Sequence, residues 1–353
     1  MIPSEENQLN EEPIEASEEL YQRFVFTIDK GQEPYRIDKF LMNRIEGATR
    51  NKLQQAINTG LVLVNNKEIK QNYKIKPFDQ VVVYSDLSPE STEIVPEQMS
   101  LNIVYEESDL MVINKPAGIV VHPGSGNYNG TLLNGVAFYL QQQKPGISEE
   151  VLPRFGLVHR IDKNTSGLLV LAKNDKAMRQ LAKQFFDHTV KREYLALVWG
   201  DVENESGTIR AHVGRNQRHR KLFEAYPEGE YGKDATTHYE VLERFNYVTL
   251  VKCVLETGRT HQIRVHMKYL GHPLFNDDFY GGDKIVKGTV FARYKQFVDN
   301  CFLICPRQAL HARTLGFTHP VSGQELFFES EIPTDISQVI EKWRNYVKGS
   351  RKE

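Results

Sequence analysis

A short polar segment in the middle of the chain holds the side chains best suited to chemistry. Residues 159–173 read HRIDKNTSGLLVLAK, which places the basic Arg160 two positions before the carboxylate of Asp162. Residues 164–167 are turn formers, and residues 167–172 form an apolar run typical of a strand buried on both faces. Asp162 and Arg160 would then lie on a loop held by rigid core, where reactive groups usually lie. Taken alone, the pattern favours a simpler reading, a solvated loop before a strand.

A second chemical feature is a basic run at residues 210–221, RAHVGRNQRHRK, which contains five Lys or Arg, two His and no acid. One interpretation is an exposed β-hairpin that is solvated by its charges. The other is contact with phosphate groups, because the overall charge of −2 conceals how the charges are distributed. The candidate phosphate ligands of this run are Arg215, Arg218, Arg220 and Lys221.

The bulk properties restrict the class of protein. The 353 residues are enough for two domains, and 40% hydrophobic with 25% charged residues is ordinary for a globular chain. No segment approaches the ~18 apolar residues of a membrane span. Residues 1–19 carry seven glutamates and no basic residue, so we expect a disordered acidic tail over residues 1–20 rather than a signal peptide. Three cysteines without zinc spacing indicate a reduced, cytoplasmic protein with no metal site.

Residues 21–88 predict a small α/β unit. We expect strands at 24–28, 61–65 and 80–84, a helix at 37–45 and a second helix from a cap at Thr49 to a stop at Gly60. Arg36, Arg50 and Lys52 are candidate RNA ligands on these helices, although an ordinary exposed helix surface explains them as well. Residues 89–100 are rich in proline and acids and read as a linker.

Residues 101–345 predict an α+β domain with a mixed, largely antiparallel sheet, because helices and strands follow in an irregular order. Strands are expected at 103–106, 110–114, 194–199, 237–243 and 248–256. Asn174 should cap a helix with Met178, Leu181, Ala182 and Phe185 facing inward. The glycines at 124 and 126 lack the spacing of a phosphate-binding loop.

Three blocks of this sequence resemble, in the same order, the motifs of the RluA/RluD-type pseudouridine synthases. HRIDKNTSGLLVLAK at 159–173 fits the signature H-R-[LI]-D-x-x-T-S-G-[LIV]-[LIV]-[LIV]-x-[AC]-K without a gap, and KREYLALV at 191–198 and LETGRTHQIRVH at 255–266 resemble the two later motifs. Residues 24–84 resemble the S4-type RNA-binding domain. A departure occurs at residues 76–79, where KPFD stands in place of the usual Lys-x-Gly-Asp.

The resemblance implies a pseudouridine synthase fold and the conversion of uridine to pseudouridine in RNA, without cofactor or metal. It assigns the catalytic carboxylate to Asp162, its partner cation to Arg264 and base stacking to Tyr194. Ile263 would pack against the base, and Arg160 would fill the space left by an extruded uridine. His159 and Thr165 complete the candidate RNA-contacting residues, although a bond to backbone is the stronger expectation for His159.

Several alternatives stay open at this point. The expected substrate is large-subunit ribosomal RNA, possibly in a ribosome precursor, and transfer RNA is the runner-up. A non-catalytic RNA-binding assembly factor should have lost Asp162, Tyr194 or Arg264, and all three are present. A glycoside hydrolase generally needs two opposed carboxylates, and the signature loop offers one. His261 and His266 lack the glutamate of a zinc protease helix and are expected to be structural. A monomer with no membrane contact is expected.

Overall fold

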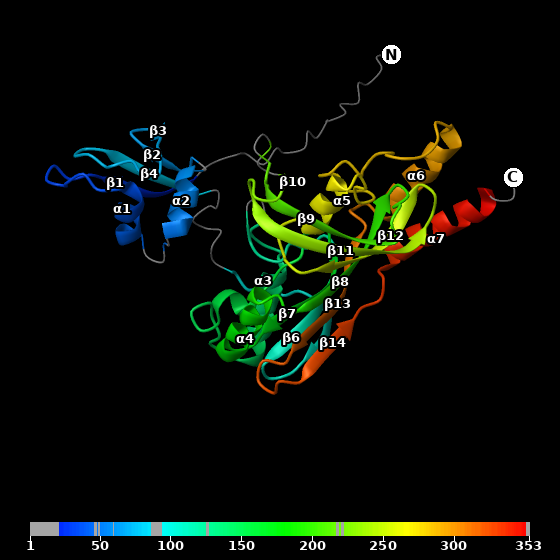
Figure 1. The fold of residues 1–353 in the computed structure, drawn as a ribbon. Helices are drawn as coiled ribbons and strands as arrows, with labels where there is room; N and C mark the ends of the chain where they lie inside the picture. Colours follow the sequence, from blue (N-terminus) through cyan, green and yellow to red (C-terminus); the bar gives the residue numbers. More distant parts are fainter. Residues whose placement is uncertain are drawn as a thin grey trace, which may run out of the picture. The chain divides into compact units, whose positions relative to one another are not determined.

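A computed structural model describes residues 21–45, 48, 50–58, 60–85, 94–124, 127–216, 219 and 222–350. The chain divides into two compact units, which are described separately (Figure 1). The first contains Met1–Glu93 and Pro123–Tyr128, and the second contains Ile94–His122 and Asn129–Glu353. The acidic tail at 1–20, the cap at Thr49 and residues 89–93 of the expected linker lie outside the described residues. Within the described part of the chain, no helix is long and apolar enough to cross a membrane.

The first unit contains two helices and a small sheet, as its sequence predicted, and the sheet is antiparallel. The strands are β1 (Tyr21–Thr27), β2 (Val62–Val64), β3 (Lys67–Glu68) and β4 (Gln80–Ser85), in the order β1-β4-β2-β3. Helices α1 (Ile37–Arg44) and α2 (Arg50–Asn58) place Ile37, Leu41, Leu53 and Ile57 in one core with the sheet. The amphipathic spacing of these residues is the physical reason why the helices form here.

The turn at residues 76–79, which departs from the S4 pattern, takes the conformation that a glycine would favour. Phe78 has φ of +71° and is 68% exposed, so its side chain packs little against the unit. The turn is held instead by Asp79, which is buried and whose carboxylate accepts hydrogen bonds from Lys76 N, the Tyr73 hydroxyl and the Asn65 amide.

The second unit is built on one large sheet that is mixed and largely antiparallel, as predicted (Figure 1). Its order is β10-β9-β11-β12-β8-β13-β7-β6-β5, with β14 also paired to β13. Every strand pair is antiparallel except β13 with β7. The strands are β5 (Ile103–Glu106), β6 (Leu110–Lys115), β7 (Ser166–Ala172), β8 (Lys191–Trp199), β9 (Ser206–Arg215), β10 (Phe223–Tyr226), β11 (Lys233–Arg244), β12 (Val248–Leu255), β13 (Leu310–Thr318) and β14 (Glu325–Glu329).

Helices cover the sheet, and they are α3 (Leu132–Gln143), α4 (Asp175–Phe186), α5 (Gln262–Tyr269), α6 (Ala292–Ile304) and α7 (Thr334–Ser350), with a short helical turn at Pro153–Gly156. Asn174 caps α4 as predicted, because its side chain accepts the amide of Ala177 at 2.9 Å. Leu181 is buried and Met178 and Phe185 are half-buried. The prediction for Ala182 was wrong, since it is exposed and Ala177 occupies the buried face instead.

Strand β7 is buried on both faces, as its apolar run predicted. Leu169 and Leu171 belong to one hydrophobic cluster, whereas Leu168, Val170 and Ala172 belong to another that includes residues of α4. The alternation of the two clusters follows the two-residue period of a strand. Each face of β7 is therefore fixed independently, which makes the start of the strand a rigid support for the loop that precedes it.

Glycine is required where β7 meets β13. Gly167 pairs with Ala312 of β13 at φ of +120°, and a Cβ atom at this position would lie 2.1 Å from the carbonyl oxygen of Ala312. Ala312 also pairs with Tyr194 of β8 on its other side. The register of β13 thus fixes the loop before β7 relative to Tyr194.

Replacing Gly167 by alanine should lower the free energy of unfolding by about 3 kcal/mol or more, because both the backbone conformation and the contact with a backbone oxygen resist a side chain. Urea unfolding followed by tryptophan fluorescence measures this, since Trp199 and Trp343 both belong to the second unit. Gly349→Ala in α7 is the matched control, because a Cβ there meets nothing within 4 Å. A Gly167→Ala protein as stable as that control would contradict the packing.

Candidate active site

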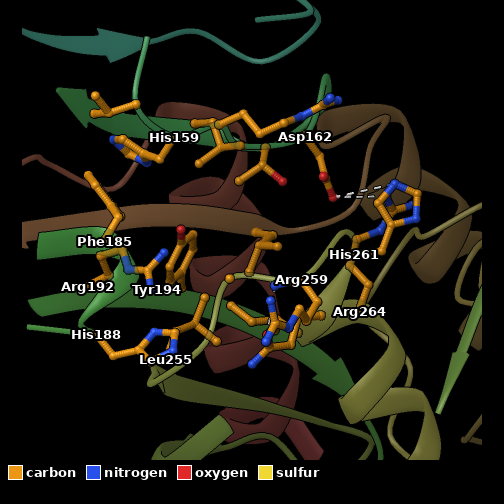
Figure 2. A pocket seen from close by; sticks show the side chains of 18 of the residues that line it. His159, Asp162, Phe185, His188, Arg192, Tyr194, Leu255, Arg259, His261 and Arg264 are labelled. Atoms are coloured by element: carbon orange, nitrogen blue, oxygen red, sulfur yellow. Dashed lines mark hydrogen bonds and ion pairs between the residues drawn. The ribbon is translucent and has the colours of Figure 1, made fainter. Parts of the chain in front are cut away.

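One pocket of the second unit brings together the residues that the three sequence blocks singled out (Figure 2). The cavity has a volume of about 440 Å³ and is bordered by the loop before β7, by β8 and by the start of α5. The candidate residues that line it are His159, Arg160, Asp162, Thr165, Tyr194, Ile263 and Arg264.

The centre of the site is a buried arginine between two carboxylates. Arg264 has a side chain that is 4% exposed, and its Nη1 donates to Asp162 Oδ2 at 3.1 Å. Its Nε and Nη2 donate to Asp277 at 2.7 and 2.8 Å, and Asp277 is fully buried. Burial alone would lower the pKa of the guanidinium, but the hydrogen bonds and charge of Asp277, with a contribution from Asp162, raise it above its usual value. Arg264 is therefore a fixed cation with one nitrogen directed at Asp162.

Asp277 was missed by sequence reasoning. It lies in the loop after α5, and no periodic pattern or local spacing distinguishes it from Asp278 beside it. Arg264 lies on the buried helix α5, which contains residues 262–269. No helix was predicted there.

Helix α5 begins at a left-handed residue and is anchored by one buried amide. His261 precedes the helix with φ of +57°. The side chain of Gln262, 2% exposed, accepts hydrogen bonds from the Thr257 hydroxyl and Arg259 N and donates to Thr236 O and the Thr237 hydroxyl. These bonds tie the first turn of α5 to β11, so the position of Arg264 follows from the sheet.

The loop that carries Asp162 is held through its backbone carbonyls. Lys163 O accepts from Lys115 Nζ at 3.0 Å and from Gly118 N at 2.9 Å, and Asn164 O accepts from Arg307 Nη1 at 2.9 Å. Burial, with the nearby charge of Arg307, lowers the pKa of Lys115 to about 7, while Asp162 opposes the shift. Lys115 and Arg307 thus place Asp162 without facing the cavity themselves, a role that sequence reasoning did not assign to Lys115.

His261 is a second residue that the sequence analysis undervalued. Its Nε2 lies 3.8 Å from Asp162 Oδ2, and its Nδ1 is 2.7 Å from the hydroxyl of Tyr280. Figure 2 shows Asp162 joined by dashed lines to both His261 and Arg264. Burial lowers the pKa of His261, although the charge of Asp162 opposes this, so the neutral imidazole is favoured at neutral pH. The histidine borders the carboxylate without adding a second full positive charge.

Aromatic and aliphatic groups form the other walls. Tyr194 is 7% exposed, and burial raises the pKa of its hydroxyl, which therefore stays protonated at neutral pH. Ile263, 3% exposed, and the side chains of Leu255 and Leu310 complete an apolar lining. A planar, uncharged ring can therefore be held beside Asp162, against the apolar side chains of the pocket.

The three remaining candidates of the signature loop differ in exposure. Arg160 is exposed at the pocket, whereas Thr165 is 1% exposed and its hydroxyl accepts from the Gln308 amide at 3.4 Å. His159 stacks on Phe185 with ring centroids 4.3 Å apart, and its Nε2 accepts the amide of Val170 at 3.0 Å. The backbone bond expected for His159 is therefore present.

The described candidates for phosphate contact, Arg36, Arg50 and Arg215, are not among the residues that line the pocket. Arg36 and Arg50 of the first unit are partly exposed, and both form ion pairs with the fully buried Asp38. Arg215 is exposed at the end of β9, with its guanidinium 5.4 Å from the Phe223 ring. The side chain of Lys52 and the residues Arg218, Arg220 and Lys221 lie outside the described part of the chain.

The comparisons with known proteins show which families the chain resembles. The sequence pattern described as RNA pseudouridylate synthase matches residues 109–269, and the S4 domain pattern matches residues 36–81. The chain is 43% identical to an uncharacterized RNA pseudouridine synthase of Chlorobaculum parvum over 92% of its own length and 98% of the relative's. It is 42% identical to the ribosomal large subunit pseudouridine synthase D of Neisseria meningitidis serogroup B, over 86% and 78% of the two chains.

A solved structure shares the fold. Human RNA pseudouridylate synthase domain containing 4 superposes with a TM-score of 0.51 at 21% identity, over 69% of this chain and 93% of the human one. At this identity the likeness concerns the fold alone.

The two carboxylates around Arg264 should contribute very differently to stability. Asp277→Asn should lower the free energy of unfolding by about 3 kcal/mol, since it removes the charge that holds a buried cation. Asp162→Asn should change it by less than about 1 kcal/mol, because Asp162 is 19% exposed and Arg264 keeps Asp277. Urea unfolding of the two variants checks this difference, and equal losses would show that Asp277 does not anchor the arginine.

Proposed function

The chain belongs to the RNA pseudouridylate synthase family, and we propose that Asp162 is the catalytic carboxylate of its reaction. The enzyme isomerises uridine in RNA to pseudouridine. The observation that carries the assignment is the 3.1 Å contact between Asp162 and the buried Arg264, at the wall of a pocket whose described lining has no other carboxylate.

The reaction breaks the bond from ribose carbon 1 to the base nitrogen and rejoins the base through its carbon 5. Asp162 either attacks ribose carbon 1 or removes the proton from carbon 2 of the ribose, and both routes need an ionised carboxylate beside the sugar. A partly buried carboxylate is stabilised in this form by a neighbouring cation, which is the role of Arg264. No atom is gained or lost overall, because the proton leaving carbon 5 is replaced by one on the base nitrogen.

The walls of the pocket would retain the base while it is detached from the sugar. Tyr194 stacks on the ring, a contact worth ~1–3 kcal/mol, and Ile263 packs against it. A uridine within folded RNA must leave its stack to reach Asp162, at a cost of a few kcal/mol. Arg160, exposed two residues before Asp162, fills the space that the uridine vacates.

Large-subunit ribosomal RNA is the substrate that we propose. Support comes from relatives named ribosomal large subunit pseudouridine synthase D and from the S4 domain match, which adds an RNA-binding unit. In this proposal residues 21–88 form an RNA-binding domain. The side chains that contact RNA phosphates are Arg36, Arg50 and Lys52 of this domain and Arg215, Arg218, Arg220 and Lys221 of the catalytic domain. Residues 89–100 link the RNA-binding domain to the catalytic domain at 101–345. The protein acts as a monomer in the cytoplasm, on free or ribosome-precursor RNA.

The reaction is tested with large-subunit ribosomal RNA transcribed with uridine that is tritiated at carbon 5. Forming the new carbon–carbon bond must release that tritium to water. We expect release by the wild type and a loss of at least about 1,000-fold with Asp162→Asn, since no other carboxylate of the described lining can replace Asp162.

Asp278→Asn is the matched control, because Asp278 is exposed and outside the pocket lining. Tritium release retained by Asp162→Asn would show that another group is the catalyst. Release by no variant from ribosomal RNA, but by the wild type from transfer RNA, would replace the proposed substrate and keep the reaction.

A further inference from the structure

The pocket continues beyond Tyr194 into a part that the proposed chemistry does not use. We call this part the aromatic lobe, and its residues are His159, Phe185, Phe186, His188 and Arg192. Figure 2 shows His159, Phe185 and Arg192 together on the side of Tyr194 away from Arg264. Phe186 is 81% exposed and His188 is exposed, so the lobe is reached from solvent.

Arg192 is a buried cation without an ionic partner in the described structure. Arg192 is 7% exposed, and the central carbon of its guanidinium lies 5.4 Å from the centroid of the Phe185 ring. Among the described residues, none forms a hydrogen bond or ion pair with this guanidinium, and its Nε is fully buried. An uncompensated buried charge costs several kcal/mol, so a site of this kind is expected to gain an acceptor when the protein works.

His159 presents a second donor of the same kind in this lobe. Its Nε2 accepts the Val170 amide, and burial lowers the pKa of the imidazole to about 3, so the neutral ring carries its proton on Nδ1. That Nδ1 is buried and finds no acceptor among the described residues. Two buried donors without an acceptor indicate a ligand rich in oxygen.

The charge of the pocket favours an anion. Its described lining contains four arginines, Arg160, Arg192, Arg259 and Arg264, against the single carboxylate of Asp162. Arg264 is already compensated by Asp162 and Asp277. The planar fork of an arginine matches the oxygens of a phosphate in a bidentate contact.

The position of Arg192 relative to Tyr194 indicates that the anion is a phosphate of the RNA backbone. Arg192 and Tyr194 are two residues apart on β8, so both point to the same face of the strand, roughly 7 Å apart along it. When a base is stacked on Tyr194, Arg192 therefore contacts the same nucleotide or the adjacent one. The anionic part of either nucleotide is the backbone phosphate.

We propose that Arg192, assisted by His159, binds a backbone phosphate that flanks the extruded uridine. This inference rests on the proposed function, since it requires an RNA strand in the pocket. Arg192 is then a binding residue for the substrate, and Phe185 orients its guanidinium. Phosphate contacts of this kind position a strand without reading its sequence.

The test uses a synthetic RNA stem-loop that contains the uridine mapped by tritium release. One phosphate, either 5′ or 3′ of that uridine, is replaced by an uncharged methylphosphonate. For the wild type, one of the two substitutions should raise KM, and the dissociation constant of the RNA, by about 10-fold or more. For Arg192→Gln the same substitution should have an effect below about threefold, because the contact is already lost.

Arg293→Gln is the matched control, since Arg293 is exposed on α6 and does not line the pocket. It should show the full wild-type response to the methylphosphonate. Arg192→Lys keeps the charge and should retain part of the response, which separates phosphate binding from a role in packing alone. Each ratio compares two RNAs on one protein, so a partial loss of folded protein does not affect it.

The proposal is overturned if neither methylphosphonate weakens binding to the wild type. It is overturned equally if the 10-fold penalty persists in Arg192→Gln, because the phosphate must then contact another group. A wild-type enzyme that does not release tritium from any RNA contradicts the proposed function, and the inference about Arg192, which rests on that function, is overturned with it.

Discussion

The positive charge of Arg264 is buried, and the arrangement of the site follows from the need to compensate it. Asp277, which is fully buried, accepts from two nitrogens of the guanidinium and holds it in one orientation. The remaining nitrogen then points to Asp162, which is partly exposed in the pocket. Arg264 is therefore paired with two carboxylates, of which Asp277 is structural and Asp162 faces the substrate. Asp162 can react while Asp277 keeps the arginine in place.

The two ends of this contact are 102 residues apart in sequence, and different parts of the fold position them. On one side, β13 pairs with both β7 and β8 at Ala312, and Lys115 and Arg307 hold the carbonyls of the Asp162 loop. On the other, Gln262 ties the start of α5 to β11. Because these supports are buried and fully hydrogen-bonded, the carboxylate and the cation meet without the cost of ordering them during catalysis.

The sequence predicted correctly those elements that are determined by residues close together in the chain. The apolar run of β7 and the cap at Asn174 are examples, and the mixed sheet was confirmed with them. Helix α5 was not predicted, since it has eight residues, starts at a left-handed histidine and owes its burial to the surrounding sheet. Asp277, His261 and Lys115 were missed for a related reason, because only the tertiary fold brings them close to Asp162. The pairing of Arg36 and Arg50 with a buried aspartate was likewise invisible in a helix pattern.

The most direct measurement is the single-turnover rate of isomerisation by Arg264→Lys at saturating enzyme, together with its dissociation constant for RNA. A lysine ammonium carries its donors on one nitrogen, so it cannot reach both carboxylates as the three guanidinium nitrogens do. If the shared arginine sets the geometry of Asp162, the rate should fall by at least about 100-fold while the dissociation constant changes by less than about threefold. A rate within about threefold of the wild type would contradict the central role of this cation.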